Sequence, residues 1–419
     1  MCTIVRMSTT STAPPTTAAR RARWAVSALF FTNGALFANL LPRYPEVKDA
    51  LGLDNATYGL TIIAFPAGAI AAGLLAGMLI RWAGSGRMAV AGTLVTAIGV
   101  LAAGLAPSLP LFVVALLAAG AADSITDVAQ NAHGLRVQRD YGRSILNSFH
   151  AIWSIGAVTG GGMAAAAIAL RMPLGLHLAI SGAVFAVVAL VALRFTLPGH
   201  DPDTVAVAPT DPEGPARRRG PSARVVVLLI ALVLIAIAGT VVEDAGFSWA
   251  ALYLGDGLGA APALAATGLI ALVGAQFVGR IVGDPLVDRF GQRAVARVGG
   301  VIIALGMGVA LLFPSVPGTI AGFAAAGFGV ATLVPAAMAG ADELPGLRRG
   351  TGLAIVSWLM RLGFLVSPPV VGALSEVVGL RYALLVIPAA GVVTLLLAGV
   401  LVGRRGAGAG VDEGASVPA

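Results

Sequence analysis

The chain has 419 residues, of which 58% are hydrophobic and only 11% are charged, and its mean hydropathy is +0.90. A soluble domain carries about twice this share of charged residues, because they cover its surface. The composition therefore excludes a soluble globular protein, and it equally excludes a disordered chain. The formal net charge of +7 comes almost entirely from arginine. This suits the cytoplasmic loops of a membrane protein better than a nucleic-acid interface.

Twelve apolar stretches are long enough to cross a bilayer, which takes about 20 residues of helix. They are predicted near residues 24–41, 56–80, 88–106, 109–132, 146–170, 175–196, 225–253, 262–283, 295–313, 318–340, 351–374 and 382–403. Most segments between them are short, so consecutive helices are expected to be antiparallel neighbours. The sequence thus predicts an all-α membrane protein with twelve transmembrane helices.

The positions of the basic residues predict how the chain is oriented. With the N-terminus inside, 21 of the 27 basic residues fall in segments on the inner side, and 4 fall on the outer side. Basic residues gather in cytoplasmic loops. We therefore expect a multi-pass protein of the bacterial cytoplasmic (inner) membrane, with both termini in the cytoplasm.

One inner segment differs from the other connections in length and composition. Residues 198–223 are rich in Pro, Asp and Arg, which is typical of a flexible linker. The linker divides the twelve spans into six and six. The predicted domains are, in chain order, an N-terminal tail (1–23), a six-helix bundle (24–197), the linker (198–223), a second six-helix bundle (224–403) and a C-terminal tail (404–419).

The two halves contain a weak sequence repeat with an offset of 207 residues. It places Gly84 on Gly291, in the hairpin that follows the second span of each half. Arg81 stands in the first copy where the second copy has Asp288. Two six-helix halves with the same basic hairpin are the arrangement of a parallel-repeat transporter.

This hairpin resembles the loop signature of the major facilitator superfamily, Gly-x-Leu-x-Asp-Arg-x-Gly-x-Arg/Lys. The second copy keeps the core of the signature in Asp288, Arg289, Gly291 and Arg293, whereas the first copy departs from it at Arg81. The resemblance covers residues 24–403. It implies the superfamily fold, with a solute site between the halves.

Within the superfamily, the chain is similar to bacterial transporters of the fucose-permease type, which are sugar:proton symporters. The similarity is carried by segments at 123–133, 150–156, 243–254 and 279–284. It implies transport of a solute without naming the solute.

Polar residues inside the fourth span are candidates for the solute or proton site, because a charge within a bilayer is costly without a partner or a cavity. Asp123, Asp127 and Asn131 follow one another at intervals of four residues, so they share one face of a helix. One interpretation makes Asp123 or Asp127 a protonatable or solute-binding carboxylate. The other makes the stripe a structural or gating feature.

The seventh span contains two adjacent carboxylates, Glu243 and Asp244. Glu243 matches a position of the resembling family and is the candidate proton carrier. Gly239 and Gly246 flank the pair, and we expect them to permit a break in this helix. Adjacent residues point to different sides of a helix, so only one carboxylate needs to face a cavity.

Arg361 lies near the middle of the eleventh span, where a guanidinium stays charged. Two interpretations are equally open. Arg361 is either the counter-charge of Asp123 or Glu243, or the anchor of an anionic solute.

A second polar stripe lies on the eighth span, beside the hairpin signature. Gln276, Arg280 and Asp284 follow one another at intervals of four residues. We assign a gating role on the inner side to these residues and to the hairpin. The predicted gating residues are Arg280, Asp284, Asp288, Arg289 and Arg293.

Three further side chains complete the predicted solute site. Asn33, midway along the first span, is a hydrogen-bonding candidate. His150 can titrate or simply pack, and Trp249 can stack on a sugar ring or anchor a helix at the bilayer surface.

The remaining patterns indicate what the protein works with. No Gly-Lys-Ser/Thr phosphate loop is present, and the four histidines lack metal-ligand spacing. We expect no enzyme activity, cofactor, metal or nucleic-acid partner. The prediction is a monomeric secondary transporter in the lipid bilayer. It moves a small, sugar-like solute, and this transport is coupled to the movement of protons. The alternatives are a proton-driven exporter of drugs or metabolites and, more distantly, a membrane-embedded enzyme or receptor.

Overall fold

The computed structural model describes residues 16–141, 145–199, 222–345, 347 and 351–401. Within its helices, the side chains of Leu74, Leu146, Asn147, Asp284 and Ala354 lie outside the described part. The described residues are almost entirely helical and contain no β-strand. Twelve helical segments are long and apolar enough to span a membrane. This confirms the predicted all-α fold with twelve transmembrane helices.

The first six spans are formed by the helices that precede the predicted linker. They are α1 (Thr17–Ala38), η1 (Leu41–Arg43), α2 (Tyr44–Ala50), α3 (Asn55–Ile62), α4 (Ala64–Ala83), α5 (Ser85–Gly104), α6 (Leu109–Tyr141), α7 (Leu146–Ala169) and α8 (Leu174–Leu193). The first helix begins earlier than predicted, because the Thr16 hydroxyl caps it by accepting a hydrogen bond from the Ala19 amide at 3.1 Å.

The last six spans are formed by the helices that follow the linker. They are α9 (Ala223–Leu252), the π-helical turn η3 (Tyr253–Gly257), α10 (Pro262–Ala265), α11 (Thr267–Phe290), α12 (Gln292–Leu312), α13 (Val316–Val330), α14 (Leu333–Asp342), α15 (Thr351–Leu359), α16 (Arg361–Val378), α17 (Leu380–Ala383), α18 (Val386–Leu397) and η4 (Ala398–Val400). Of the predicted linker, residues 200–221 lie outside the described residues.

The break predicted in the seventh span is wrong. Helix α9 is continuous through Glu243 and becomes a π-helical turn only at Tyr253. Gly246 instead provides a close contact with α11, because a Cβ there would lie 2.4 Å from Leu272 Cδ1. The eleventh span is interrupted near its middle, between α15 and α16 at Met360, and the tenth is interrupted between α13 and α14.

The repeat between the halves is present in the backbone. Gly84 joins α4 to α5 with φ 87° and ψ 147°, and Gly291 joins α11 to α12 with φ 83° and ψ 154°. This conformation is readily available only to glycine. The two hairpins aligned in the sequence are therefore the same turn.

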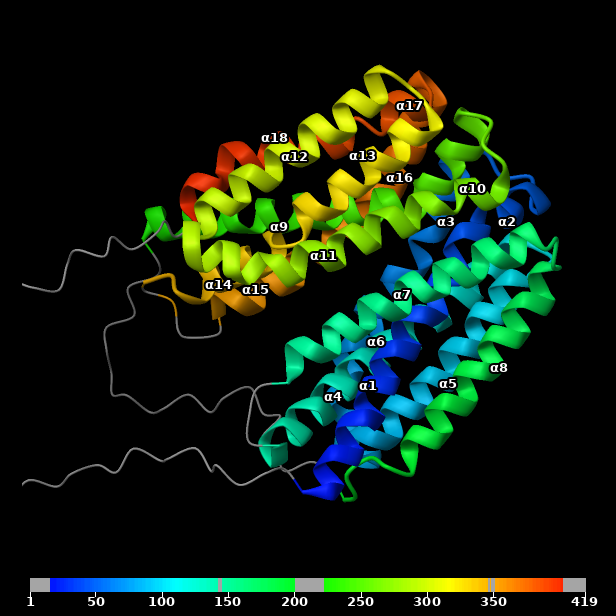
Figure 1. The fold of residues 1–419 in the computed structure, drawn as a ribbon, viewed down its shortest axis with the longest axis vertical. Coiled ribbons are helices and arrows are strands. Elements are labelled where there is room, and N and C mark those ends of the chain that lie inside the picture. Colours follow the sequence, from blue (N-terminus) through cyan, green and yellow to red (C-terminus); the bar gives the residue numbers. More distant parts are fainter. Residues whose placement is uncertain (1–15, 142–144, 200–221, 346, 348–350, 402–419) are drawn as a thin grey trace, which may run out of the picture.

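The helices α1–α8 and α9–α18 form two bundles that lie side by side (Figure 1). The bundles diverge towards the end at which α1 and α9 begin and α8 ends, which we call the linker end. They approach each other at the opposite end, near α2, α3, α10 and α17, which we call the far end (Figure 1).

Contacts between the bundles close the far end. The Tyr58 hydroxyl of α3 donates to the Ser248 carbonyl of α9 at 2.8 Å, and its ring meets Trp249 edge-on at 5.1 Å. The Asn55 amide donates to Glu376 Oε1 of α16 at 2.8 Å. The structure is thus closed at the far end.

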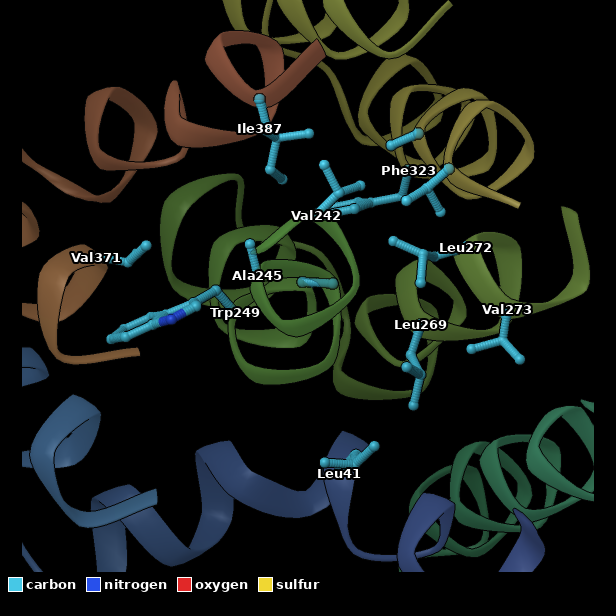
Figure 2. Close-up of a cluster of buried hydrophobic side chains, with 14 of the residues drawn as sticks. Leu41, Val242, Ala245, Trp249, Leu269, Leu272, Val273, Phe323, Val371 and Ile387 are labelled. Carbon is cyan, nitrogen blue, oxygen red and sulfur yellow. The ribbon is translucent and has the colours of Figure 1, made fainter. Parts of the chain in front are cut away.

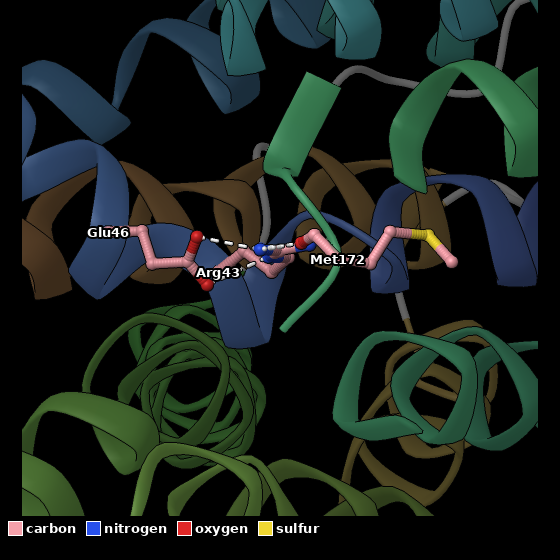
Figure 3. A network of polar contacts seen from close by, with 3 residues as sticks. All are labelled: Arg43, Glu46 and Met172. Carbon is pink, nitrogen blue, oxygen red and sulfur yellow. Dashed lines mark hydrogen bonds and ion pairs between the residues drawn. The ribbon is translucent and has the colours of Figure 1, made fainter. Parts of the chain in front are cut away.

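Arg43 holds the far end of the first bundle together. Its guanidinium pairs with Glu46 at 2.7 Å and donates to the Met172 carbonyl at 2.9 Å, just before α8 (Figure 3). The Arg43 side chain is almost fully buried, so this pairing offsets the cost of removing its charge from water. It fixes the turn between the first two spans.

The main hydrophobic core surrounds α9. Val242 and Ala245 of α9 pack with Leu272 of α11 and Phe323 of α13 (Figure 2). Helix α9 is therefore wrapped on several sides by its own bundle. This fixes its carboxylates relative to α11 and α16.

Candidate functional site

A cavity of about 290 Å³ lies between the two bundles. Helices α1, α4, α6 and α7 line it from one side, and α9, α11 and α16 line it from the other. Its polar and charged lining residues are Asn33, Tyr44, Asp123, Trp153, Glu243, Asp244, Ser248 and Arg361. Aromatic rings at Phe37, Phe65, Phe247 and Phe364 form much of the remaining wall.

Asn33 is the centre of a polar network in the first bundle. Its amide nitrogen donates to Asp123 Oδ1 at 2.7 Å, which joins α1 to α6. Its carbonyl oxygen accepts from the Trp153 indole at 2.8 Å and from the Gln130 amide at 3.3 Å. Asn33 is buried, so these bonds satisfy a polar side chain that would otherwise be costly in the bilayer.

The predicted stripe on the fourth span lies on one face of α6. Gln130 donates to Asp127 Oδ1 at 3.5 Å, and Asn131 donates to the same oxygen at 3.0 Å. Asp127 is exposed, whereas Asp123 is partly buried in the cavity wall. The stripe thus runs from the cavity towards the linker end.

Glu243 is held by two partners on α11. Gln276 donates a hydrogen bond to Glu243 Oε1, and Arg280 pairs with the same oxygen at 3.7 Å. Arg280 also donates to the Ser154 hydroxyl of α7 at 3.3 Å. Arg280 therefore links the cavity carboxylate to the opposite bundle, which sequence analysis had assigned only to a gate.

Asp244 lines the same cavity, although only one of the two adjacent carboxylates was expected to do so. It is 6% exposed and accepts a hydrogen bond from the Ser248 hydroxyl at 3.3 Å. Its other oxygen, Oδ2, is buried without a hydrogen-bond partner. Helix α9 therefore presents both carboxylates to the cavity.

Arg361 is the first residue of α16 and lines the cavity. It makes no hydrogen bond or ion pair with any described residue, and its charge acts on Asp127 only at longer range. The ion pairs with Asp123 or Glu243 that sequence analysis left open are not formed in this structure.

Trp249 does not line the cavity. It is fully buried and extends from α9 towards Val371 of α16, on the side of α9 opposite to Leu272 (Figure 2). Its Tyr58 contact belongs to the far-end closure instead. A solute-stacking role for Trp249 stays a prediction for another conformation, and Trp153 is the tryptophan that lines the cavity here.

His150 lies outside the cavity lining. It is exposed on α7, edge-on to Phe30 at 5.2 Å between ring centroids. Its ring interacts electrostatically with the charges of Asp127 and Arg280. It therefore lies on the path from the linker end to the cavity rather than in the cavity itself.

Among the described residues, Asp288, Arg289 and Arg293 of the hairpin make no hydrogen bond or ion pair with the first bundle. Arg293 donates to the Leu401 carbonyl at 3.1 Å, and the Arg289 guanidinium lies over the Phe290 ring, 5.2 Å from its centroid. Asp288 is exposed, and the side chain of Asp284 lies outside the described residues. A gate formed by these residues stays a prediction for another conformation.

Sequence reasoning missed three contributors to the site. Tyr44 lies in a segment read as a connection, and Gln130 carries no charge that would single it out in an apolar span. Ser154 lies one turn after His150 and becomes visible only through its contact with Arg280. Among the described residues, no group of three or more His, Cys, Asp or Glu is placed to hold a metal.

Comparison with known proteins identifies the family to which this architecture belongs. The family model described as the Major Facilitator Superfamily matches residues 26–285 and 244–417. The chain belongs to the major facilitator superfamily. The expected resemblance is thus confirmed, and the protein is a multi-pass membrane protein of a transporter family.

One curated relative and three solved structures show the extent of the likeness. Membrane protein MosC of Rhizobium meliloti is 31% identical over 374 residues, 88% of this chain and 87% of the relative. A mutant of the nucleoside transporter NupG superposes with a TM-score of 0.73 at 14% identity, over 90% of this chain and 99% of that chain.

The other two structures are a D-xylose-proton symporter and FucP. The symporter has a TM-score of 0.66 at 16% identity, over 91% of this chain and 96% of its own. FucP, a superfamily transporter in the outward conformation, has a TM-score of 0.59 at 19% identity, over 91% of this chain and 99% of the FucP chain. These likenesses show the fold.

Proposed function

We propose that the protein is a proton-coupled secondary transporter that moves a small polar solute across the bacterial inner membrane by alternating access. The observation that carries the proposal is the central cavity, which receives Asp123 from one bundle and Glu243 and Asp244 from the other. Superfamily transporters bind solute between two halves that rock around the site. A carboxylate inside the membrane is costly to keep, so we take it as a functional residue.

Glu243 is the proposed proton carrier. Its charge is matched by Arg280, and it accepts a hydrogen bond from Gln276; Arg280 also reaches Ser154 of the other bundle. Adding a proton to Glu243 removes the attraction that holds Arg280. A proton at this position thus changes a contact between the two bundles, which is what coupling requires.

Asp123 and Asn33 are the proposed solute-binding groups of the first bundle. Both line the cavity, and Trp153 adds an aromatic face beside them. A carboxylate, an amide and an indole suit the hydroxyl groups and apolar faces of a sugar-like solute. The likeness to a structure titled as a D-xylose-proton symporter supports this class.

We infer further that both termini face the cytoplasm and that the transporter works as a monomer. The excess of arginine on the segments at the linker end supports the orientation. The cavity lies between the two bundles of the same chain, which is the arrangement that a monomeric transporter needs. In this orientation, the described conformation is closed on the outer side.

An exporter of drugs or metabolites is the second candidate. The rings of Phe37, Phe65, Phe247 and Phe364 favour it, because they give the cavity an apolar wall. The same carboxylates serve either direction of transport. Identifying the transported solute therefore distinguishes the two candidate functions.

The test is the lumenal pH of proteoliposomes that contain a pH-sensitive dye. Sugars, organic acids, amino acids and cationic drugs are added in turn to liposomes with and without the protein. We expect one class to move protons only when the protein is present. The absence of any solute-driven pH change across the whole panel would contradict proton coupling.

The matched control for the carboxylate assignment is an exposed acidic residue outside the cavity. Asp49 lies exposed on α2 and does not line the cavity. We expect Asp49→Asn to retain the solute-driven pH change, whereas Glu243→Gln loses it. Retention of the pH change in Glu243→Gln would overturn the role of Glu243.

A further inference from the structure

Arg361 stands at a fixed point in the wall of the central cavity. It follows Met360, where the eleventh span is interrupted, and it begins α16. The Met360 carbonyl accepts hydrogen bonds from the Thr240 hydroxyl and from the Gly363 amide, both at 2.9 Å. A Cβ at Gly363 would lie 1.9 Å from Thr240 Oγ1, so α16 packs directly on α9 at this point. The backbone that carries Arg361 is therefore held in place.

The guanidinium at this fixed point has no partner in the protein. No described residue hydrogen-bonds or pairs with Arg361, although three carboxylates line the same cavity. An arginine stays charged in any protein environment, and an unpaired charge inside a membrane is costly. An anion bound beside Arg361 would offset this cost.

The cavity carboxylates are engaged elsewhere. Asp123 accepts from Asn33, and Glu243 is bound by Arg280 and Gln276. The anion that Arg361 lacks is therefore not supplied by the lining residues in this conformation. A carboxylate fits the planar fork of a guanidinium through two parallel hydrogen bonds.

The cavity also offers an acceptor for hydroxyl groups. Asp123 lines it from α6 of the first bundle, and among the described residues only its Oδ1 accepts a side-chain hydrogen bond, from Asn33. Asp244 is less accessible, because its Oδ2 is buried and the Ser367 hydroxyl of α16, which does not line the cavity, lies against this carboxylate. A solute in the cavity therefore has Arg361 on one wall and the second oxygen of Asp123 on the other.

We propose that the transported solute is a polyhydroxy carboxylate, whose carboxylate binds Arg361 and whose hydroxyl groups donate to Asp123. This inference rests on the proposed transport function and names its solute class. The cavity volume of about 290 Å³ accommodates a molecule of monosaccharide size. The carboxylate satisfies the one unpaired lining cation among the described residues, and a hydroxyl donates to the Asp123 oxygen that Asn33 does not bind.

The test compares four solutes that differ in these two features. Glucuronate has both hydroxyl groups and a carboxylate, glucose has only the hydroxyl groups, hexanoate has only the carboxylate, and hexanol has neither. Binding to the purified full-length protein is followed by tryptophan fluorescence, since Trp153 lines the cavity. We expect glucuronate to bind at least about tenfold more tightly than the other three, which corresponds to 1.4 kcal/mol.

Two arginine variants assign the preference to its residue. Arg361→Gln is expected to weaken glucuronate binding at least about tenfold and to leave glucose binding unchanged, because one bidentate charge-assisted contact is lost. Arg297→Gln is the matched control, since Arg297 is exposed on α12 and outside the cavity lining. Thermal unfolding of both variants checks that they are folded.

Three outcomes would overturn the proposal. They are equal or tighter binding of glucose than of glucuronate, an unchanged glucuronate affinity in folded Arg361→Gln, and binding of none of the four solutes. Proton movement driven by a neutral sugar or a cationic drug in the dye experiment would then leave the transport function standing. The failure of the solute class and the failure of the transport function are thus separate results.

Discussion

The two bundles share a number of membrane spans and a hairpin turn, yet they hold their cavity carboxylates by different means. In the first bundle, Asp123 accepts from the neutral amide of Asn33. In the second, Glu243 faces the cation Arg280. A proton on Asp123 breaks no ion pair, whereas a proton on Glu243 releases a guanidinium that also contacts Ser154 across the bundle interface. From this comparison we infer that, in the proposed function, coupling belongs to the second bundle and solute binding is shared.

The largest expected effect is the loss of proton coupling in Glu243→Gln. The amide cannot carry a proton, so uphill accumulation of solute should vanish while solute exchange at equal concentrations continues. Proteoliposome accumulation and counterflow assays measure the two separately. Asp123→Asn is the comparison variant from the first bundle, with weaker solute binding but retained proton movement. Equal loss of coupling in both variants would contradict the division between the bundles.

A smaller effect is expected for Arg280→Gln, which leaves Glu243 without its counter-charge. Because the Arg280 side chain is 37% exposed, we expect solvent to moderate the effect, to about a tenfold loss of transport rate. The double variant Arg280→Gln/Glu243→Gln should regain exchange, because no unpaired carboxylate remains. Additive losses in the double variant would show that the two side chains act independently.

Asn33→Ala should affect stability more than coupling. The substitution leaves the Trp153 indole and the Asp123 carboxylate without a partner, at a cost of about 1–3 kcal/mol each. Thermal unfolding in detergent should occur at a lower temperature, while any remaining flux still moves protons. A variant that unfolds like the parent protein but loses proton coupling would reverse the assignment.

The smallest effect is expected at the far end. Tyr58→Phe removes the hydrogen bond to the Ser248 carbonyl, which is worth about 1 kcal/mol, or about a fivefold shift between conformations. Labelling of a single cysteine near the far end should become faster, because the closed state is less populated. Thr159→Val is a control, since its hydroxyl bonds only within α7, to the Ile155 carbonyl at 2.8 Å. Unchanged labelling would show that the Tyr58 bond does not hold the far end closed.

The sequence predicted the fold because bilayer-spanning segments follow directly from length and hydropathy. The turn at Gly84 and Gly291 was also predictable, since the repeat aligned two glycines that share a positive φ. Asp123 and Glu243 were identifiable as site candidates because carboxylates are rare inside apolar spans. These signals are local in the chain.

The differences between prediction and structure concern contacts between distant segments. Gly246 was read as permitting a break, but its missing side chain serves the close approach of Leu272. Trp249 was assigned to the solute, but its orientation depends on Tyr58 and Val371, which come from other helices. The partner of Arg280 was likewise undetermined, because helical spacing gives the face of a residue and not the helix opposite.

The measurement that tests the account most directly is a pair of distances between the bundles, at both ends of the molecule. Spin labels are placed at Ala50 and Val378 for the far end, and at Arg87 and Arg297 for the linker end, in protein with Cys2→Ser. The account predicts that transported solute lengthens the far-end distance and shortens the linker-end distance. Two distances that stay constant or change in the same direction would contradict alternating access around the central cavity.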